Sequence, residues 1–194
     1  MSSSNPPTRD RILKATQNLL ESGGAGSVRM SDIAKRAGIS RQALYLHFPN
    51  RADLLIATTR YLDEVHEIGA EVDAQVMAVQ GQARLDGFLV AWGNHIPRIY
   101  GVGKALMAIK DTDAEAKAAW DDRMIAVRGL CEASVHSLSA QGQLTSDLTQ
   151  KQAVDVLWML VSVRNWEHLT QVCGWSQADY LAYLRRAASR LIGV

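Results

Sequence analysis

The chain has 194 residues, 47% of them hydrophobic and 21% charged, a composition typical of a soluble globular protein with a sizeable buried core. No apolar run approaches the roughly 18 residues that a membrane-spanning helix needs, so we expect no membrane partner. The net charge is +1, but residues 1–60 carry a net charge of +5 and residues 61–194 one of −4. This asymmetry fits a polyanion that binds only the basic part, and it fits ordinary variation of surface charge equally well.

The first residues and the two cysteines bear on the expected cellular location of the chain. Segment 1–7 is polar and lacks the apolar core of a signal peptide, so we expect a short disordered tail there. Cys131 and Cys173 are too few and too far apart for a disulfide framework, and they suit a reducing cytoplasm. Glu132 and His136 lie one helical turn apart without a third ligand, so we expect no metal and no cofactor.

Apolar residues recur at helical rather than alternating spacing along almost the whole chain, which predicts an all-α protein. Gly and Pro mark the boundaries, and Asn50, Thr149 with Gln152, and Ser176 are placed to cap helices. About nine helices are predicted, over residues 8–21, 30–37, 41–47, 51–72, 81–96, 98–110, 113–140, 150–171 and 177–192.

The most informative segment is 30–48, in which two short helices are predicted to cross closely. Ala34 and Ala37 are small enough on the inner face of the first helix to let the second approach. Gly38 permits the positive φ of a tight turn, and Ser40 can cap the second helix. This order of features predicts a helix-turn-helix.

The second of these helices, 41–47, is predicted to have an inner and an outer face. Leu44 and Phe48 lie one turn apart and point inward. The outward side chains include donors suited to DNA bases, since Arg can pair with guanine and Gln with adenine. These outward residues are Arg41, Gln42, Tyr45 and His47. The alternative is a helical hairpin with a polar face and no role in DNA binding.

Together these features resemble the helix-turn-helix of the tetracycline-repressor (TetR) family of transcriptional regulators. The resemblance rests on Asp32-Ile33-Ala34, Ala37-Gly38-Ile39-Ser40, Leu44-Tyr45-Leu46-His47-Phe48, Arg51 and Leu54. The Gly174-Trp175-Ser176 turn and the helix that carries Tyr180 are similar to the family's dimerisation region. The resemblance implies an N-terminal three-helix DNA-binding domain, residues 1–55, and a larger helical ligand-binding and dimerisation domain, residues 56–194.

By this resemblance, Tyr45 and Arg51 would contact DNA phosphates, and the other outward residues of helix 41–47 would face bases. The family usually has a small residue at the position of Gln42 and Lys at the position of Arg51. A Thr that the family often has near the start of the preceding helix is absent, and Arg29 and Ser31 are the expected substitutes. The expected DNA-binding residues are Arg29, Ser31, Ser40, Arg41, Gln42, Tyr45, His47 and Arg51.

The resemblance also implies a small-molecule effector bound between helices of the larger domain. Aromatic and Met side chains would favour a bulky, mostly apolar ligand, with a histidine placed to orient it. The candidates are Trp92, His95, Met107, Trp120, Met124, Trp158 and Met159. Ordinary core packing is the alternative explanation of aromatic residues at helical spacing.

The two C-terminal helices carry more apolar surface than one internal contact requires, which predicts pairing with the same helices of a second subunit. The expected interface residues are Leu157, Leu160, Val161, Arg164, Tyr180, Leu181, Leu184, Ala188 and Leu191. The alternative is that these helices form core within one chain.

The resemblance therefore implies a ligand-responsive repressor that binds a palindromic operator in double-stranded DNA as a homodimer. An α-helical enzyme or metal-binding protein is the alternative from another class, and a purely structural interaction module is a third. The sequence contains no G-x-S-x-G, no H-E-x-x-H, no phosphate-binding Gly loop and no paired Cys motif, so we expect no enzyme activity.

Overall fold

The computed structural model describes residues 7–22, 28–65, 76 and 78–193. The chain divides into two compact units, Met1–Val65 with Gly101–Arg123 and His66–Tyr100 with Met124–Val194. Both units consist of helices, and the described residues contain no strand, which confirms the predicted all-α class. Leu144 and Gly193 form an isolated antiparallel β-bridge, which is not part of a strand.

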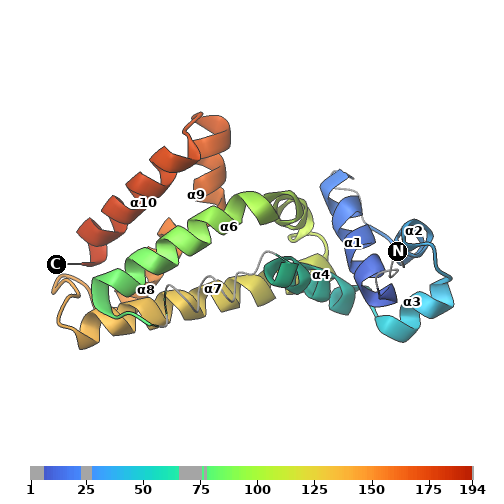
Figure 1. Ribbon diagram of the computed structural model, residues 1–194, viewed down its shortest axis with the longest axis horizontal. Coiled ribbons are helices and arrows are strands. Elements are labelled where there is room, and N and C mark those ends of the chain that lie inside the picture. Colours follow the sequence, from blue (N-terminus) through green and yellow to red (C-terminus); the bar gives the residue numbers. More distant parts are fainter. Residues whose placement is uncertain (1–6, 23–27, 66–75, 77, 194) are drawn as a thin grey trace, which may run out of the picture. The chain divides into compact units, whose positions relative to one another are not determined.

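The first unit contains four short helices and parts of two long ones. Helix α1 packs on α2 and α4, and α3 follows α2 after a tight turn (Figure 1). The helices are α1 (Thr8–Ser22), α2 (Met30–Ala37), α3 (Arg41–His47) and α4 (Arg51–Val65), with the end of α6 (Gly81–Ile109) and the start of α7 (Ala114–Ala140). Fully buried apolar residues from several helices form its core, among them Ile12, Ile33, Leu44, Leu54 and Leu55.

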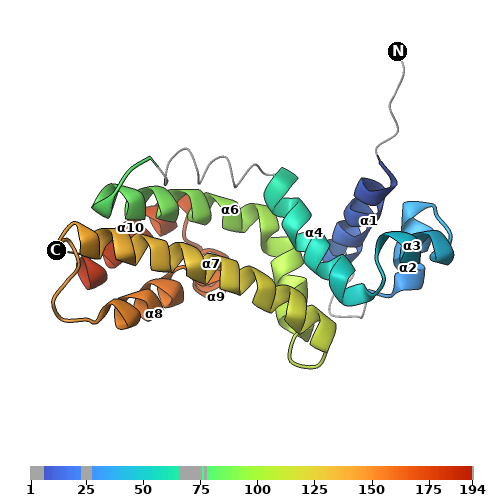
Figure 2. The ribbon, with the colours of Figure 1, turned by 90° about the horizontal axis from the view of Figure 1, so that it is seen from below.

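The second unit contains the rest of α6 and α7 and the C-terminal helices. Figure 2 shows α8 beside the C-terminal part of α7, where Arg128 of α7 forms an ion pair with Asp155 of α8. The C-terminal helices are α8 (Gln150–Leu160), α9 (Val163–Glu167), the π-helix η2 (His168–Val172) and α10 (Gln177–Ile192).

The predicted helix caps are confirmed at atomic detail. The side chains of Ser40 and Ser176 accept hydrogen bonds from the N–H groups of Ala43 and Asp179. Thr149 and Gln152 form the reciprocal capping box that opens α8. Because these caps satisfy N–H groups that have no partner within the helix, they fix where α3, α8 and α10 begin.

Two helices predicted over 81–96 and 98–110 are one helix, α6, with Pro97 inside it. Proline has no N–H to donate to the carbonyl of Gly93, four residues earlier. The side-chain amide of Gln177 donates to that carbonyl instead, at 2.8 Å. Gly93 also lies where α10 approaches closely, because a Cβ there would stand 2.4 Å from Leu181 Cδ2. A distant side chain therefore compensates for the missing backbone hydrogen bond, and the helix continues.

The single helix predicted over 150–171 is interrupted after Leu160. Trp92 Nε1 donates to the Val161 carbonyl at 2.7 Å, and Ser162 caps the following helix by accepting from the Arg164 N–H. A buried indole and a local hydroxyl thus take over hydrogen bonds that a continuous helix would make. The chain then continues through a π-helical turn before the Gly174 turn, where φ is +72°.

Two predictions fall on residues outside the described ones: the tail before Pro7 and the part of the predicted helix 51–72 beyond Val65. In the described part of the chain, no helix is long and apolar enough to cross a membrane.

Candidate nucleic-acid interface

A glycine turn joins α2 to α3. Gly38 has φ +67° and ψ +38°, the left-handed conformation that costs glycine little and other residues more. The Ile39 N–H donates to the Ala34 carbonyl at 3.0 Å, and the Arg11 guanidinium donates to the Ala37 carbonyl at 2.6 Å. The last carbonyls of α2 are therefore satisfied from two directions, which fixes the direction in which α3 leaves the turn.

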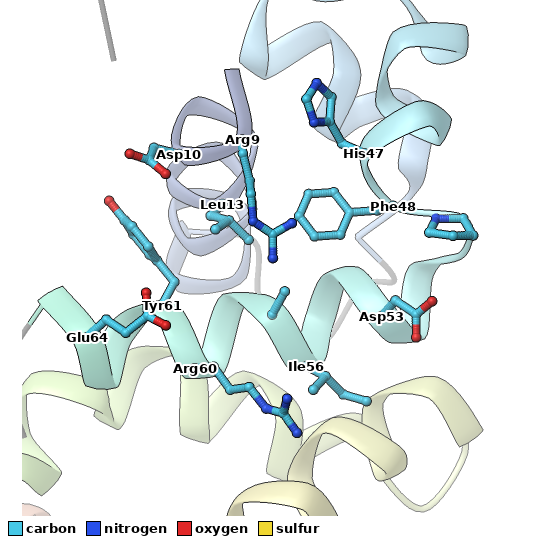
Figure 3. A pocket seen from close by; sticks show the side chains of 12 residues that line it. Arg9, Asp10, Leu13, His47, Phe48, Asp53, Ile56, Arg60, Tyr61 and Glu64 are labelled. Atoms are coloured by element: carbon cyan, nitrogen blue, oxygen red, sulfur yellow. The ribbon is translucent and has the colours of Figure 1, made fainter. Parts of the chain in front are cut away.

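The inner face of α3 is part of the core. Leu44 and Phe48 are 0% and 2% exposed, as their spacing predicted. The guanidinium of Arg9 on α1 lies 4.7 Å from the centre of the Phe48 ring, a cation–π contact visible in Figure 3. The buried side chains of Leu44 and Phe48, together with this contact to Arg9, therefore fix the orientation of α3 relative to α1.

The outer face of α3 consists of polar and aromatic side chains that reach solvent. Arg41 lies above the Tyr45 ring, with 5.9 Å between the guanidinium carbon and the ring centre. Of the eight expected DNA-binding residues, the structure exposes seven: Arg29, Ser31, Ser40, Arg41, Gln42, Tyr45 and His47. Apart from Arg29 and Ser31, at the start of α2, they lie on α3 or at its cap. A short helix with such a face fits the major groove of DNA.

Arg51 differs from the expectation of a phosphate contact. Its side chain is 12% exposed, and its Nη1 lies 2.8 Å from Asp113 and 3.1 Å from Glu115 at the start of α7. Its Nε donates to the Val28 carbonyl at 2.6 Å. Because these partners already bind Nε and Nη1, Arg51 joins the start of α4 to Val28, just before α2, and to the start of α7, which leaves little of its charge available to a phosphate.

The Asp113 carboxylate stabilises both this ion pair and the start of α7. Burial alone would raise the pKa of Asp113, but hydrogen bonds from the Ala116 N–H and from Arg51 outweigh it and lower the pKa below its ordinary value. The same carboxylate accepts from the Glu115 N–H at 3.1 Å. It therefore acts as a helix cap and as the anionic partner of Arg51.

Two more ion pairs connect α4 with α7. Arg60 donates to Asp122 at 2.6 Å, and Arg123 pairs with Asp63. The hydrogen bond from Arg60 lowers the pKa of Asp122, and the same contact raises the pKa of Arg60. Helix α4 is thus attached to α7 and the residue before it at three points along its length.

A pocket of about 500 Å³ lies between α1, α4 and the end of α3 (Figure 3). Its charged lining combines both signs, since Arg9 and Arg60 are cationic whereas Asp10, Asp53 and Glu64 are anionic. This mixed charge favours neither an anionic nor a cationic ligand. The remaining lining residues are Leu13, His47, Phe48, Pro49, Ile56, Ala57 and Tyr61.

The seven candidate ligand-binding residues are not brought together in one unit. Met107 and Trp120 belong to the first unit, whereas the other five belong to the second. Trp158 and Met159 are 36% and 56% exposed, and Trp158 stacks on the Arg128 guanidinium. Trp92 and His95 are buried side by side, with 5.8 Å between ring centres, and Met124 is half-buried in the same unit.

Most of the expected dimer-interface residues are core of a single protomer. Five of them are at most 2% exposed, in a region where α8 and α10 pack on each other and Tyr180 lies against Gly93 of α6. They are Leu157, Val161, Tyr180, Leu184 and Ala188. Leu160 and Leu181 are half-buried, and Arg164 and Leu191 are exposed. The apolar surface that remains for a partner includes Trp158, Met159, Tyr183 and Leu191.

The two cysteines differ in their surroundings. Burial raises the pKa of Cys131 to about 12, and Cys173 is exposed. A thiol with such a raised pKa stays protonated and unreactive near neutral pH. Within the described ranges, no group of three or more His, Cys, Asp or Glu side chains is arranged to hold a metal ion.

Comparisons with known proteins add independent information about residues 12–58, which match the family model for bacterial regulatory proteins of the tetR family. The chain is 38% identical over 60 residues to the nucleoid occlusion factor SlmA of Aliivibrio fischeri and 37% identical over 60 residues to the transcriptional regulator TtgR of Pseudomonas putida. These matches cover 30% and 31% of this chain but only 31% and 29% of the relatives.

Solved structures extend the likeness to the whole fold. A protein from Rhodococcus sp. that is assigned to the TetR-family regulators has a TM-score of 0.76 at 20% identity, covering 95% of this chain and 98% of the other. NalD of Pseudomonas aeruginosa, the secondary repressor of the MexAB-OprM multidrug efflux pump, has a TM-score of 0.68 at 18% identity, covering 96% and 95%. Residues 12–58 therefore match the model for bacterial regulatory proteins of the tetR family, and the chain as a whole shares the all-helical fold of these structures.

Proposed function

We propose that this chain is a transcriptional repressor that binds a palindromic operator as a homodimer and is released by a small, mostly apolar effector. The observation that carries the proposal is the outer face of α3, where Arg41, Gln42 and Tyr45 reach solvent while Leu44 and Phe48 fill the core beneath them. DNA binding belongs to residues 1–55, and effector binding and dimerisation belong to residues 56–194.

The exposed residues divide between reading bases and contacting the backbone. Arg41 and Gln42 have the donors that pair with guanine and adenine in the major groove, and His47 lies on the same short helix. Tyr45 and the residues at the helix starts contact phosphates, which set the position of α3 on the duplex. The backbone contacts at the helix starts are Arg29, Ser31 and Ser40. Arg51 contributes indirectly by fixing α4.

Dimerisation is supported by apolar side chains left exposed on α8 and α10. Trp158, Met159 and Leu191 are between 36% and 56% exposed, which is costly for large apolar groups in a protomer without a partner. Leu160 and Leu181 lie on the same two helices, and together with Arg164 on α9 they complete the proposed surface. Two copies related by a twofold axis would present two copies of α3 to the two halves of a palindrome.

Effector binding is supported by buried aromatic and polar groups in the second unit. Trp92 and His95 are 7% and 1% exposed, and a protein of similar fold from Saccharomonospora viridis was solved in complex with choline, with a TM-score of 0.73 at 18% identity. We infer an effector site at Trp92, His95 and Met124. A ligand releases DNA only if it binds the two conformations of the dimer with different affinities.

A gel-shift titration against the DNA flanking the chain's own gene tests the proposal. The wild type should bind one palindromic site, with affinity that falls steeply as salt rises, because cationic side chains displace counterions from phosphates. Arg41→Ala should weaken binding about 5- to 150-fold and relax base preference at one position. Inserting half a helical turn of DNA between the half-sites should abolish tight binding, because the two α3 helices could no longer reach both.

The matched control is Lys151→Ala, which removes one positive charge from an 81% exposed side chain of the other unit. This variant should bind like the wild type. Binding that is weak, insensitive to salt and equal for wild type and Arg41→Ala would overturn the proposal. It would leave the enzyme and structural-module alternatives. The match to nucleoid occlusion factors and the match to TtgR each extend over 60 residues at nearly equal identity, so the former supports DNA binding without favouring the role of those factors.

A further inference from the structure

One apolar residue on the outer face of α3 has no role in the contacts described above. Leu46 is 83% exposed, the highest value for any large hydrophobic residue in the described part of the chain. It is not needed for the core, since Leu44 and Phe48 fill the space beneath α3. Isolated apolar residues on a protein surface are common, but this one stands within the face that we propose enters the major groove.

Its position on the helix places it among the base-reading side chains. Gln42 and Leu46 are four residues apart, so they lie on the same side of α3, about 6 Å apart along its axis. Tyr45 is the neighbour of Leu46 and is also exposed, at 41%. When α3 contacts base edges through Gln42, Leu46 therefore faces base edges one or two base pairs away.

The major groove offers one apolar group to such a side chain, the C5-methyl group of thymine. Cytosine presents an amino donor and no methyl group, so a leucine against it would remove water from a polar group without replacing the hydrogen bond. We propose that Leu46 is a specificity-determining residue that selects thymine through its C5-methyl group. This inference rests on the proposed operator binding.

The test uses the operator duplex found in the gel-shift experiment, with its thymines replaced by deoxyuridine one position at a time. This replacement removes the methyl group and leaves base pairing unchanged. For the wild type, replacement at one position should weaken binding about fourfold for each half-site, the value of one buried methyl group. All other positions should show no more than a small change.

Leu46→Ala should remove this discrimination, so that thymine and deoxyuridine duplexes bind equally at the sensitive position. The exposed site should leave folding intact, which a thermal unfolding curve equal to that of the wild type would establish. Gln42→Ala is the matched control. It should lose preference at the base that Gln42 reads and keep the wild-type ratio between thymine and deoxyuridine.

The inference is overturned if a wild type that binds its operator tightly is insensitive to deoxyuridine at every position. It is also overturned if Leu46→Ala keeps the discrimination or weakens both duplexes equally, since the latter marks a contact with the DNA backbone. Failure to bind any operator would instead overturn the proposed function and this inference together.

Discussion

In the first unit, the contacts that join α4 to α7 are ion pairs, whereas in the second unit two buried tryptophans are held by hydrogen bonds between neutral groups. Arg51, at 12% exposure, lies between Asp113 and Glu115. In the second unit, Trp92 donates to the Val161 carbonyl, and Trp166 donates to Gln177. Charged contacts respond to pH and salt and neutral ones do not. The unit that carries α3 is therefore the one that solution conditions can loosen.

Ion pairs also occur in the second unit, but their groups are closer to water. Arg185 of α10 pairs with Asp86 of α6 with side chains 49% and 32% exposed. Solvent screens such a pair, so its contribution to stability is small. The comparison thus concerns poorly exposed ion pairs in the first unit and buried neutral hydrogen bonds in the second. Variants that remove one contact of each kind test it.

The largest effect is expected for Asp113→Asn in the first unit. Asparagine can still cap α7, but it leaves the poorly exposed Arg51 guanidinium without its main counter-charge. The free energy of unfolding should fall by about 2–3 kcal/mol, which is less than for a fully buried pair because both groups keep some contact with water. Urea unfolding at pH 7 measures it, with Asp111→Asn, 80% exposed, as the control.

This difference should depend on pH. The folded chain lowers the pKa of Asp113 below its ordinary value of 3.8, so the stabilisation is complete above that value and is lost as pH falls through the folded pKa. The gap between wild type and Asp113→Asn should therefore shrink as the pH drops below about 4. A gap that stays constant down to pH 3 would contradict the ionic role of Asp113.

A smaller effect is expected for Gln177→Ala in the second unit. It leaves the Gly93 carbonyl and the Trp166 indole N–H without partners, at a cost of about 1–2 kcal/mol in unfolding free energy. Adding Pro97→Ala should restore part of the loss, because alanine supplies the N–H that proline lacks.

A double-mutant cycle by thermal or urea unfolding measures this coupling. The Gln177→Ala effect should be the same at pH 4 and pH 7, in contrast with Asp113→Asn. If Pro97→Ala stabilises the wild type and Gln177→Ala equally, Gln177 does not compensate for the proline.

The smallest effect is expected for Arg60→Ala. Its ion pair with Asp122 is in the first unit, but the Arg60 side chain is 57% exposed, so its removal should cost less than about 1 kcal/mol. The loss should become smaller as salt is raised. An effect as large as that of Asp113→Asn would mean that burial does not explain the difference in stability contribution between the Arg51–Asp113 and Arg60–Asp122 ion pairs.

Local signals in the sequence predicted α1, α2, α3 and α10 to within a residue, because glycines, caps and buried spacing act within each helix. The fate of Pro97 was not predictable locally, since the compensating amide comes from Gln177, eighty residues later. The break at Val161 has the same cause, because it depends on the indole of Trp92. Interactions between distant residues decided both departures.

The candidate sites follow the same rule. The outward face of α3 followed from helical spacing, and the i+4 relation of Leu46 to Gln42 was a signal that the sequence already contained. The resemblance implied that Arg51 contacts a phosphate. A local motif cannot show that Asp113 and Glu115, about sixty residues later, form ion pairs with it. Five of the nine residues expected at a dimer interface are core of one protomer, because apolar spacing marks a buried face without telling which chain buries it.

Inward and outward residues lie on separate faces of α3, and this separation makes the outward face exchangeable. The inward Leu44 and Phe48, with the Ser40 cap, fix the position of α3 on the core. Positions 41, 42, 45, 46 and 47 can therefore be exchanged as a set. A transplant of these five outward side chains from a tetR-family regulator should carry that regulator's operator preference with it. The rest of the chain would serve as an unchanged scaffold.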